Sequence, residues 1–135
     1  MTLLHKSRPR RTVLVVEDAL TTRCILDQFF ARAGCDVVHA SDPESALLRL
    51  KSSCVDAVIL DLRLSDDRSG LEVLEQMRLE ARFDDVPVVV LTGVTQVDES
   101  EEEVITRHRA HLLYKSFGYR EVVERLEKII TSEAA

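Results

Sequence analysis

Four short apolar runs, each followed by an acidic, hydroxyl or basic residue, constrain the fold of this chain more than any other feature. The runs cover 13–16, 58–60, 88–91 and 112–114, and the residues that follow them are Glu17 with Asp18, Asp61, Thr92 and Lys115. Longer segments with helical periodicity separate the runs, a pattern typical of strands that alternate with helices around a parallel sheet. Because ligands bind at the carboxyl ends of parallel strands, we expect these residues to lie at one site.

The periodicity along the chain predicts five βα units. The expected strands are 13–16, 37–38, 55–60, 88–91 and 112–114, and the expected helices are 20–33, one starting at 41–44, one starting near Gly70, 98–109 and 119–131. Nearly continuous apolar strands indicate a sheet that helices cover on both faces. Right-handed crossovers place the carboxyl end of every strand at the same edge. We therefore predict an α/β fold, a flavodoxin-like (βα)5 sandwich with five parallel strands in the order 2-1-3-4-5 and a switch point between strands 1 and 3.

The length and the charge distribution predict a single domain. We expect a flexible basic arm at 1–11, one domain at 12–131 and a tail at 132–135. The net charge is −6, and four basic residues without an acid lie in the first twelve, so the remainder carries −10. A surface this acidic repels the phosphates of nucleic acids, so we expect no direct binding of the fold to DNA or RNA.

The chain has no sequence signal for membrane insertion or secretion. No stretch approaches the roughly 18–20 apolar residues needed to cross a bilayer, and the N-terminus lacks the apolar core and cleavage site of a signal peptide. Cys24, Cys35 and Cys54 have neither metal-site spacing nor nearby histidines, so we interpret them as reduced, small apolar residues. We therefore expect a cytoplasmic protein without membrane contact.

The residues at the strand ends suit metal-assisted phosphoryl chemistry. Carboxylates held close together repel one another unless a cation lies among them. Mg²⁺ suits this cluster because it prefers oxygen ligands and keeps positions for phosphate oxygens. Asp61 can act as a nucleophile, while the Lys115 ammonium and the Thr92 hydroxyl can stabilise charge on phosphoryl oxygens. Taken singly, each such residue is more often a helix cap, a turn residue or a surface charge, but their coincidence at matching strand ends favours one site.

Sequence motifs around these residues extend the pattern. The segment VLVVEDALTTRCILDQFFARAG carries the acidic pair, VDAVILDLRL carries Asp61, VVVLTG carries Thr92 and LLYKSF carries Lys115. As a set, and with these intervals between them, the motifs resemble the receiver domain of two-component response regulators over residues 12–131.

The resemblance implies a function and a role for each residue. Asp61 would accept a phosphoryl group from a histidine kinase or a phosphotransfer protein. Thr92 and Lys115 would contact that group, and the protein ligands of Mg²⁺ would be Glu17, Asp18, Asp61 and the backbone carbonyl of Arg63. It implies a switch rather than an enzyme, one that catalyses only its own phosphotransfer and a slow hydrolysis of the aspartyl-phosphate. Because the chain ends just after the fifth predicted helix, we expect either that the output passes through an unknown partner protein or that the chain is a fragment of a longer protein.

Several positions depart from the family's pattern and leave a second function open. Ser116 follows Lys115 where the family usually has proline after a cis bond, so either the Lys115–Ser116 bond is cis or the loop takes another course. Leu112 stands at the usual aromatic position, and the stretch 66–69 indicates a one-residue insertion. These departures favour an alternative, a phosphorylation-independent receiver that acts as a constitutive protein-interaction module.

Overall fold

A five-stranded parallel sheet forms the centre of the computed structural model, which describes residues 10–93 and 97–134. Its strands are β1 (Arg11–Val16), β2 (Cys35–Ala40), β3 (Ala57–Asp61), β4 (Val88–Thr92) and β5 (His111–Tyr114). The helices are α1 (Leu20–Arg32), α2 (Pro43–Ser52), α3 (Leu71–Met77), α4 (Glu99–Arg107) and α5 (Tyr119–Ala134), with single 3-10 turns η2 (Ala81–Phe83) and η3 (Lys115–Phe117). The strand order β2-β1-β3-β4-β5 confirms the predicted flavodoxin-like α/β fold.

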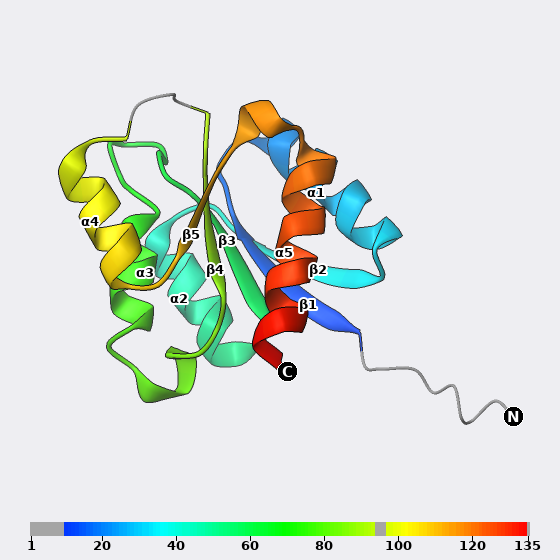
Figure 1. The fold of residues 1–135 in the computed structure, drawn as a ribbon, viewed down its shortest axis with the longest axis horizontal. Helices are drawn as coiled ribbons and strands as arrows, with labels where there is room; N and C mark the ends of the chain where they lie inside the picture. Colours follow the sequence, from blue (N-terminus) through cyan, green and yellow to red (C-terminus); the bar gives the residue numbers. More distant parts are fainter. Residues whose placement is uncertain (1–9, 94–96, 135) are drawn as a thin grey trace, which may run out of the picture.

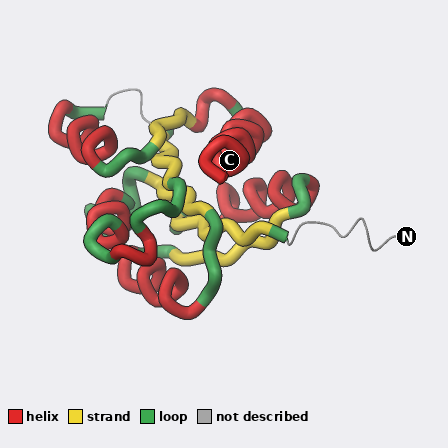
Figure 2. The backbone as a smooth tube through the Cα atoms, turned by 60° about the horizontal axis from the view of Figure 1, so that its bottom comes forward, coloured by secondary structure: helices red, strands yellow, loops and turns green. Residues whose placement is uncertain are grey.

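Helices cover both faces of the sheet, α1 and α5 on one face and α2, α3 and α4 on the other (Figure 1). Figure 2 shows the strands between these two helical layers. Successive side chains of β1 alternate between the layers: Val13 and Val15 lie under α1 and α5. Leu14 and Val16 lie under α2, α3 and α4. Both faces of the strand are buried, which explains why its apolar run is continuous rather than alternating.

Local hydrogen bonds explain where two of the helices begin. The Asp42 carboxylate accepts a hydrogen bond of 2.8 Å from the backbone N–H of Ser45, and Pro43 occupies the first turn of α2. This arrangement satisfies a backbone donor that the helix itself cannot pair. In α4 a capping box joins Asp98 to Glu101, so the helix begins at Glu99, one residue later than predicted.

Some element boundaries differ from the predicted ones. Strand β2 extends over six residues rather than two, because its whole length pairs with β1 from Arg11↔Cys35 to Val16↔Ala40. Pairing with β2 also makes Arg11, the last residue of the predicted arm, part of β1. Of the rest of that arm, Arg10 pairs with Asp36 at 3.0 Å, whereas 1–9 lie outside the described residues. At the other end, α5 continues to Ala134 and so extends into the predicted tail.

The segment after β5 differs from the family's usual cis-proline loop. No peptide bond in residues 10–93 and 97–134 is cis, so the Lys115–Ser116 bond is trans, and the second of the two predicted alternatives is correct. The chain instead forms the turn η3, and Gly118, with φ of +91°, directly follows it. Leu112, which stands where the family usually has an aromatic residue, packs against the core under α2, α3 and α4.

The structure also bears on the cysteines and on whether any helix could cross a membrane. Cys24, Cys35 and Cys54 are all free thiols, of which Cys35 is buried and the other two are exposed. Among the described helices, none combines the length and the apolar character that crossing a membrane requires.

Candidate functional site

The sheet topology brings the predicted site residues to one edge. The order of the strands reverses between β1 and β3, and parallel α/β sheets open a crevice at such a switch point. Glu17 and Asp18 directly follow β1, and Asp61 is the last residue of β3. The register pairs Val16 with Leu60, so the acids come next on neighbouring strands. The acidic residues therefore meet where the crevice opens.

Three carboxylates form a compact oxygen cluster at this position. Glu17, Asp18 and Asp61 each offer an oxygen, and these atoms lie within 4.8 Å of one another. Glu17 is 2% exposed and Asp61 is 7% exposed. Backbone amides orient both: Ala19 N–H donates to Glu17 Oε2 at 3.2 Å, and Arg63 N–H donates to Asp61 Oδ1 at 3.3 Å. An all-oxygen set of this charge and spacing fits a hard divalent cation such as Mg²⁺.

Lys115 reaches the same cluster from the turn after β5. Its Nζ donates to Glu17 Oε1 at 3.2 Å and to Asp61 Oδ2 at 3.4 Å, across 98 and 54 positions of the sequence. Partial burial alone would lower the pKa of the Lys115 ammonium, but the carboxylates of Asp61 and Glu17 outweigh it and raise the pKa. The ammonium thus stays charged and partly neutralises the acidic cluster.

Thr92 occupies the adjacent strand end. It is the last residue of β4 and is fully buried. Asp61 pairs with Leu91 in the register of β3 and β4, so Thr92 lies one residue farther along the same edge. On its other side Thr92 pairs with Tyr114, which directly precedes Lys115. All five residues predicted from the strand ends are therefore placed along one edge of the sheet.

The two consecutive acids have opposite electrostatic environments. Burial, and then the neighbouring Asp61 carboxyl, raises the pKa of Glu17 from its ordinary value of 4.5 to about 7. The pKa of Asp18 is lowered, chiefly because the Ser65 hydroxyl donates a hydrogen bond to its carboxylate. Glu17 is thus the group at this site that exchanges a proton near neutral pH, while Asp18 remains ionised.

The raised pKa of Glu17 predicts how the metal-free protein responds to pH. Because the folded state binds this proton more tightly than the unfolded state, its stabilising effect is complete below pH 4.5 and is lost as pH rises through about 7. We expect the free energy of unfolding to fall by on the order of 1–3 kcal/mol across this window. Urea unfolding at several pH values measures the change.

The variant Glu17→Gln is the control for this pH dependence. It should lack that part of the decline which belongs to Glu17, so the difference between the two proteins isolates one carboxyl from all other titrating groups. The wild-type protein should also bind Mg²⁺ about tenfold less tightly for each pH unit below 7, because Glu17 must release its proton before it can bind the ion. Identical pH profiles for both proteins would contradict the assignment.

The loop between β3 and α3 holds Asp61 in place through contacts that the sequence did not reveal. A Cβ atom on Gly70 would lie 2.2 Å from the backbone oxygen of Asp61, so only glycine fits there. Arg63 pairs with Ser69 in an antiparallel bridge, and Asp66 has φ of +62°. The signal for Gly70 was its place directly before an apolar helix, where Ser, Thr, Asp or Asn is the usual cap.

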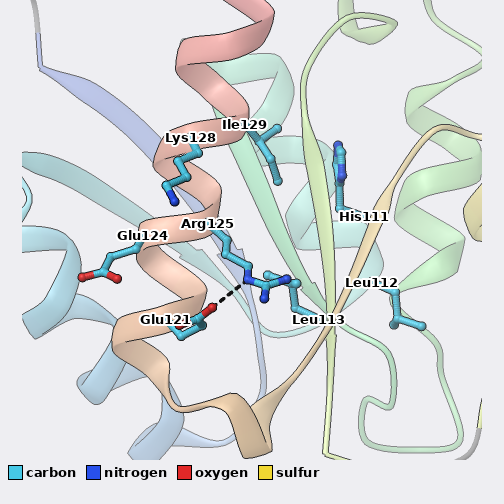
Figure 3. Close-up of a pocket in the computed structure, with 8 residues that line it drawn as sticks. All are labelled: His111, Leu112, Leu113, Glu121, Glu124, Arg125, Lys128 and Ile129. Carbon is cyan, nitrogen blue, oxygen red and sulfur yellow. Dashed lines mark hydrogen bonds and ion pairs between the residues drawn. The ribbon is translucent and has the colours of Figure 1, made fainter.

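A separate groove lies between β5 and α5 (Figure 3), and no residue of the acidic cluster lines it. Leu113 faces this groove, whereas Leu112 points away from α5. On the helix side, Arg125 donates to Glu121 at 2.8 Å. The groove has a volume of about 540 Å³ and a mixed apolar and charged lining.

Comparisons with known proteins match most of the chain. The family model described as the response regulator receiver domain matches residues 13–127. A protein-glutamate methylesterase/protein-glutamine glutaminase 1 of Anaeromyxobacter dehalogenans is 35% identical over 82 residues, which is 61% of this chain and 22% of that protein. The phosphate regulon transcriptional regulatory protein PhoB of Klebsiella pneumoniae is 29% identical over 120 residues, 89% of this chain and 52% of that protein. The chain thus spans about half or less of these relatives.

Solved structures share the same architecture. A response regulator receiver protein from Pseudomonas putida superimposes with a TM-score of 0.79 at 27% identity, covering 90% of this chain and 99% of that one. The chemotaxis response regulator CheY4 of Vibrio cholerae superimposes with a TM-score of 0.78 at 22% identity, covering 90% of this chain and 99% of that one. The second similarity concerns the fold alone.

Proposed function

Because this chain belongs to the response regulator receiver domain family, whose model matches residues 13–127, we propose that it is a phosphorylatable receiver that accepts a phosphoryl group on Asp61. The observation that carries the proposal is the contact of one ammonium, that of Lys115, with both Glu17 and Asp61 inside a cluster of three carboxylates. A carboxylate that could act as the nucleophile, carboxylates that could hold a metal ion and an ammonium lie together at one edge of the sheet, which supports phosphoryl transfer.

The proposed reaction transfers the group from a phosphohistidine. An oxygen of the Asp61 carboxylate attacks phosphorus, an O–P bond forms, the P–N bond breaks, and the histidine nitrogen keeps the electron pair. Glu17, Asp18, Asp61 and the backbone carbonyl of Arg63 would hold Mg²⁺, which when bound neutralises charge on the phosphoryl oxygens. Lys115 supplies a fixed positive charge beside the attacking carboxylate. The Thr92 hydroxyl would donate a hydrogen bond to a phosphoryl oxygen.

The donor and the output partner follow from the same proposal. We propose that a histidine kinase or a phosphotransfer protein is the phosphoryl donor and that the chain and its donor meet in the cytoplasm. An unidentified protein would bind the phosphorylated chain and pass on the signal. The chain acts as a switch whose own catalysis is limited to phosphotransfer and slow aspartyl-phosphate hydrolysis. The groove between β5 and α5 is a candidate surface for the output partner, because it is hollow, mixed in charge and separate from the site of phosphorylation.

Incubation with acetyl phosphate and Mg²⁺ tests this function. Intact-mass measurement should show one added phosphoryl group on the wild type and none on Asp61→Asn. Asp66→Asn is the matched control, because it makes the same chemical change at an exposed position of the neighbouring loop whose left-handed backbone suits asparagine. It should be phosphorylated like the wild type.

Two results would overturn the proposal. Equal labelling of the wild type and Asp61→Asn would exclude Asp61 as the acceptor. If the wild type is unlabelled and beryllofluoride with Mg²⁺ changes no amide chemical shift around Asp61, the alternative of a phosphorylation-independent interaction module replaces it.

A further inference from the structure

One residue of the β3–α3 loop touches both the acidic site and α4. The backbone N–H of Arg63 donates to Asp61 Oδ1 at 3.3 Å. The guanidinium of the same residue forms a bidentate ion pair with Glu101, 38 positions away, with N–O distances of 2.5 and 3.1 Å. Bidentate pairs between arginine and a carboxylate are directional as well as strong. Arg63 therefore connects the candidate phosphoacceptor to another element by its two ends.

The partner of Arg63 is a structural part of the first turn of α4. Glu101 Oε1 also accepts a hydrogen bond of 3.1 Å from the backbone N–H of Asp98, and Asp98 Oδ1 accepts one of 2.8 Å from Glu101 N–H. This capping box starts the helix. The Glu101 side chain is 13% exposed, against 52% for Arg63, so the carboxylate is held on the protein surface rather than free in water. A displacement of the carboxylate would disturb the helix start.

The rest of the loop is anchored on the opposite side. Leu64 N–H donates to the Arg68 carbonyl at 2.8 Å, which closes the loop on itself. The Arg68 guanidinium then binds Glu44 on α2 and Glu72 on α3, each at 2.7 Å. Because the loop is fixed toward α2 and α3, a shift of the Arg63 amide is expected to pass mainly toward α4.

We propose that the Arg63–Glu101 ion pair couples occupation of the Asp61 carboxylate by a phosphoryl group to the first turn of α4. This inference rests on the proposed function. In the structure, the pair coexists with an Asp61 carboxylate that accepts hydrogen bonds from the Arg63 N–H and from Lys115. A phosphoryl group on that carboxylate changes the oxygen atom that accepts the hydrogen bond from the Arg63 N–H. The Arg63 amide then moves, and its movement strains the ion pair with Glu101. Coupling free energies are reciprocal, so the free energy by which phosphoryl occupation weakens the Arg63–Glu101 pair equals the free energy by which the pair weakens phosphoryl occupation.

The variant Glu101→Gln tests the coupling without removing the helix cap. Glutamine keeps the oxygen that accepts from Asp98 N–H but removes the charge that pairs with Arg63. We expect beryllofluoride with Mg²⁺ to bind about fivefold more tightly, and the beryllofluoride-induced amide shifts of residues 98–102 to fall to less than half. A long-range charge effect would act in the other direction, because loss of a negative charge weakens the attraction for Mg²⁺.

Two further variants complete the experiment. Arg63→Gln should reproduce both effects, and the double variant should add nothing further, because the two residues act as one pair. Glu103→Gln is the matched control, since it makes the same change on the same helix but at a residue whose partner, Arg107, is also in α4. It should behave like the wild type.

The outcomes separate this inference from the function on which it rests. If acetyl phosphate leaves the wild type unlabelled and beryllofluoride leaves the amides of residues 61–63 unchanged, the proposed function fails. If those amides respond and the shifts at 98–102 persist in Glu101→Gln, or if the affinity is unchanged, the coupling is overturned while the function stands.

Discussion

Replacing Gly70 with alanine is expected to lower the free energy of unfolding by about 3 kcal/mol, because a methyl group there overlaps the main chain rather than a movable side chain. The added Cβ would lie 2.2 Å from the backbone oxygen of Asp61 and 3.1 Å from Leu60 Cβ. Relief requires that the start of α3 or the end of β3 move. Gly70 has φ of −61°, so the cost comes from the contact and not from a backbone conformation reserved for glycine.

Urea unfolding measures this loss, and Gly93→Ala provides the comparison. A Cβ on Gly93 would meet its nearest neighbour, the Cδ atom of Lys115, at 3.5 Å, which is an ordinary contact. Its backbone is not left-handed, so the substitution should change the free energy of unfolding by less than about 1 kcal/mol. Because the displaced atom in Gly70→Ala belongs to Asp61, that variant should also bind Mg²⁺ more weakly. Equal stability of the two variants would contradict the close approach.

Replacing Lys115 with methionine is expected to slow phosphorylation of Asp61 by acetyl phosphate about 10²-fold. The ammonium lies 3.4 Å from the attacking carboxylate and 3.2 Å from Glu17, so its removal takes away a fixed positive charge where negative charge gathers in the transition state. Methionine has a similar length and keeps the apolar contacts of the side chain. Initial rates at saturating Mg²⁺ measure the effect.

The same substitution should tighten Mg²⁺ binding severalfold, because a cation no longer competes for the two carboxylates. The titration is best made above pH 8, since loss of Lys115 raises the pKa of Glu17 further. Lys51→Met, on the exposed surface of α2, is the control and should leave the rate and the affinity unchanged. A rate for Lys115→Met within about threefold of the wild type would contradict a role for the ammonium in transfer.

The order of the elements was predictable from local patterns, whereas their ends were not. The apolar runs that became β1, β3 and β4 are buried on both faces, so hydrophobicity marks them directly. Strand β2 is longer than its apolar pair Val37–Val38, because an edge strand follows the register of its neighbour and needs fewer apolar residues. The turn η3 could not be predicted either, because the residues next to Ser116 do not determine the conformation of a loop that lacks proline.

The candidate site was predictable in its members but not in its contacts. Glu17, Asp61 and Thr92 could be placed at one edge because parallel strands all end there. The roles inferred for them from the resemblance stay predictions until the labelling and titration experiments are made. Neither Ser65 nor the side chain of Arg63 had a sequence signal, because each acts through a partner on a distant segment.

By itself, the sequence determined the fold class, the strand order and the set of residues that share the carboxyl edge of the sheet. These properties depend on periodicity and on general rules of chain topology, both of which are readable along the chain. Only the tertiary structure decided that Lys115 touches Glu17 across 98 positions, that burial brings the pKa of Glu17 to about 7, and that Gly70 must lack a side chain. It also decided that Arg63 joins the site to α4. Such properties depend on distances of a few ångströms between segments remote in sequence, which are set only when the whole core packs.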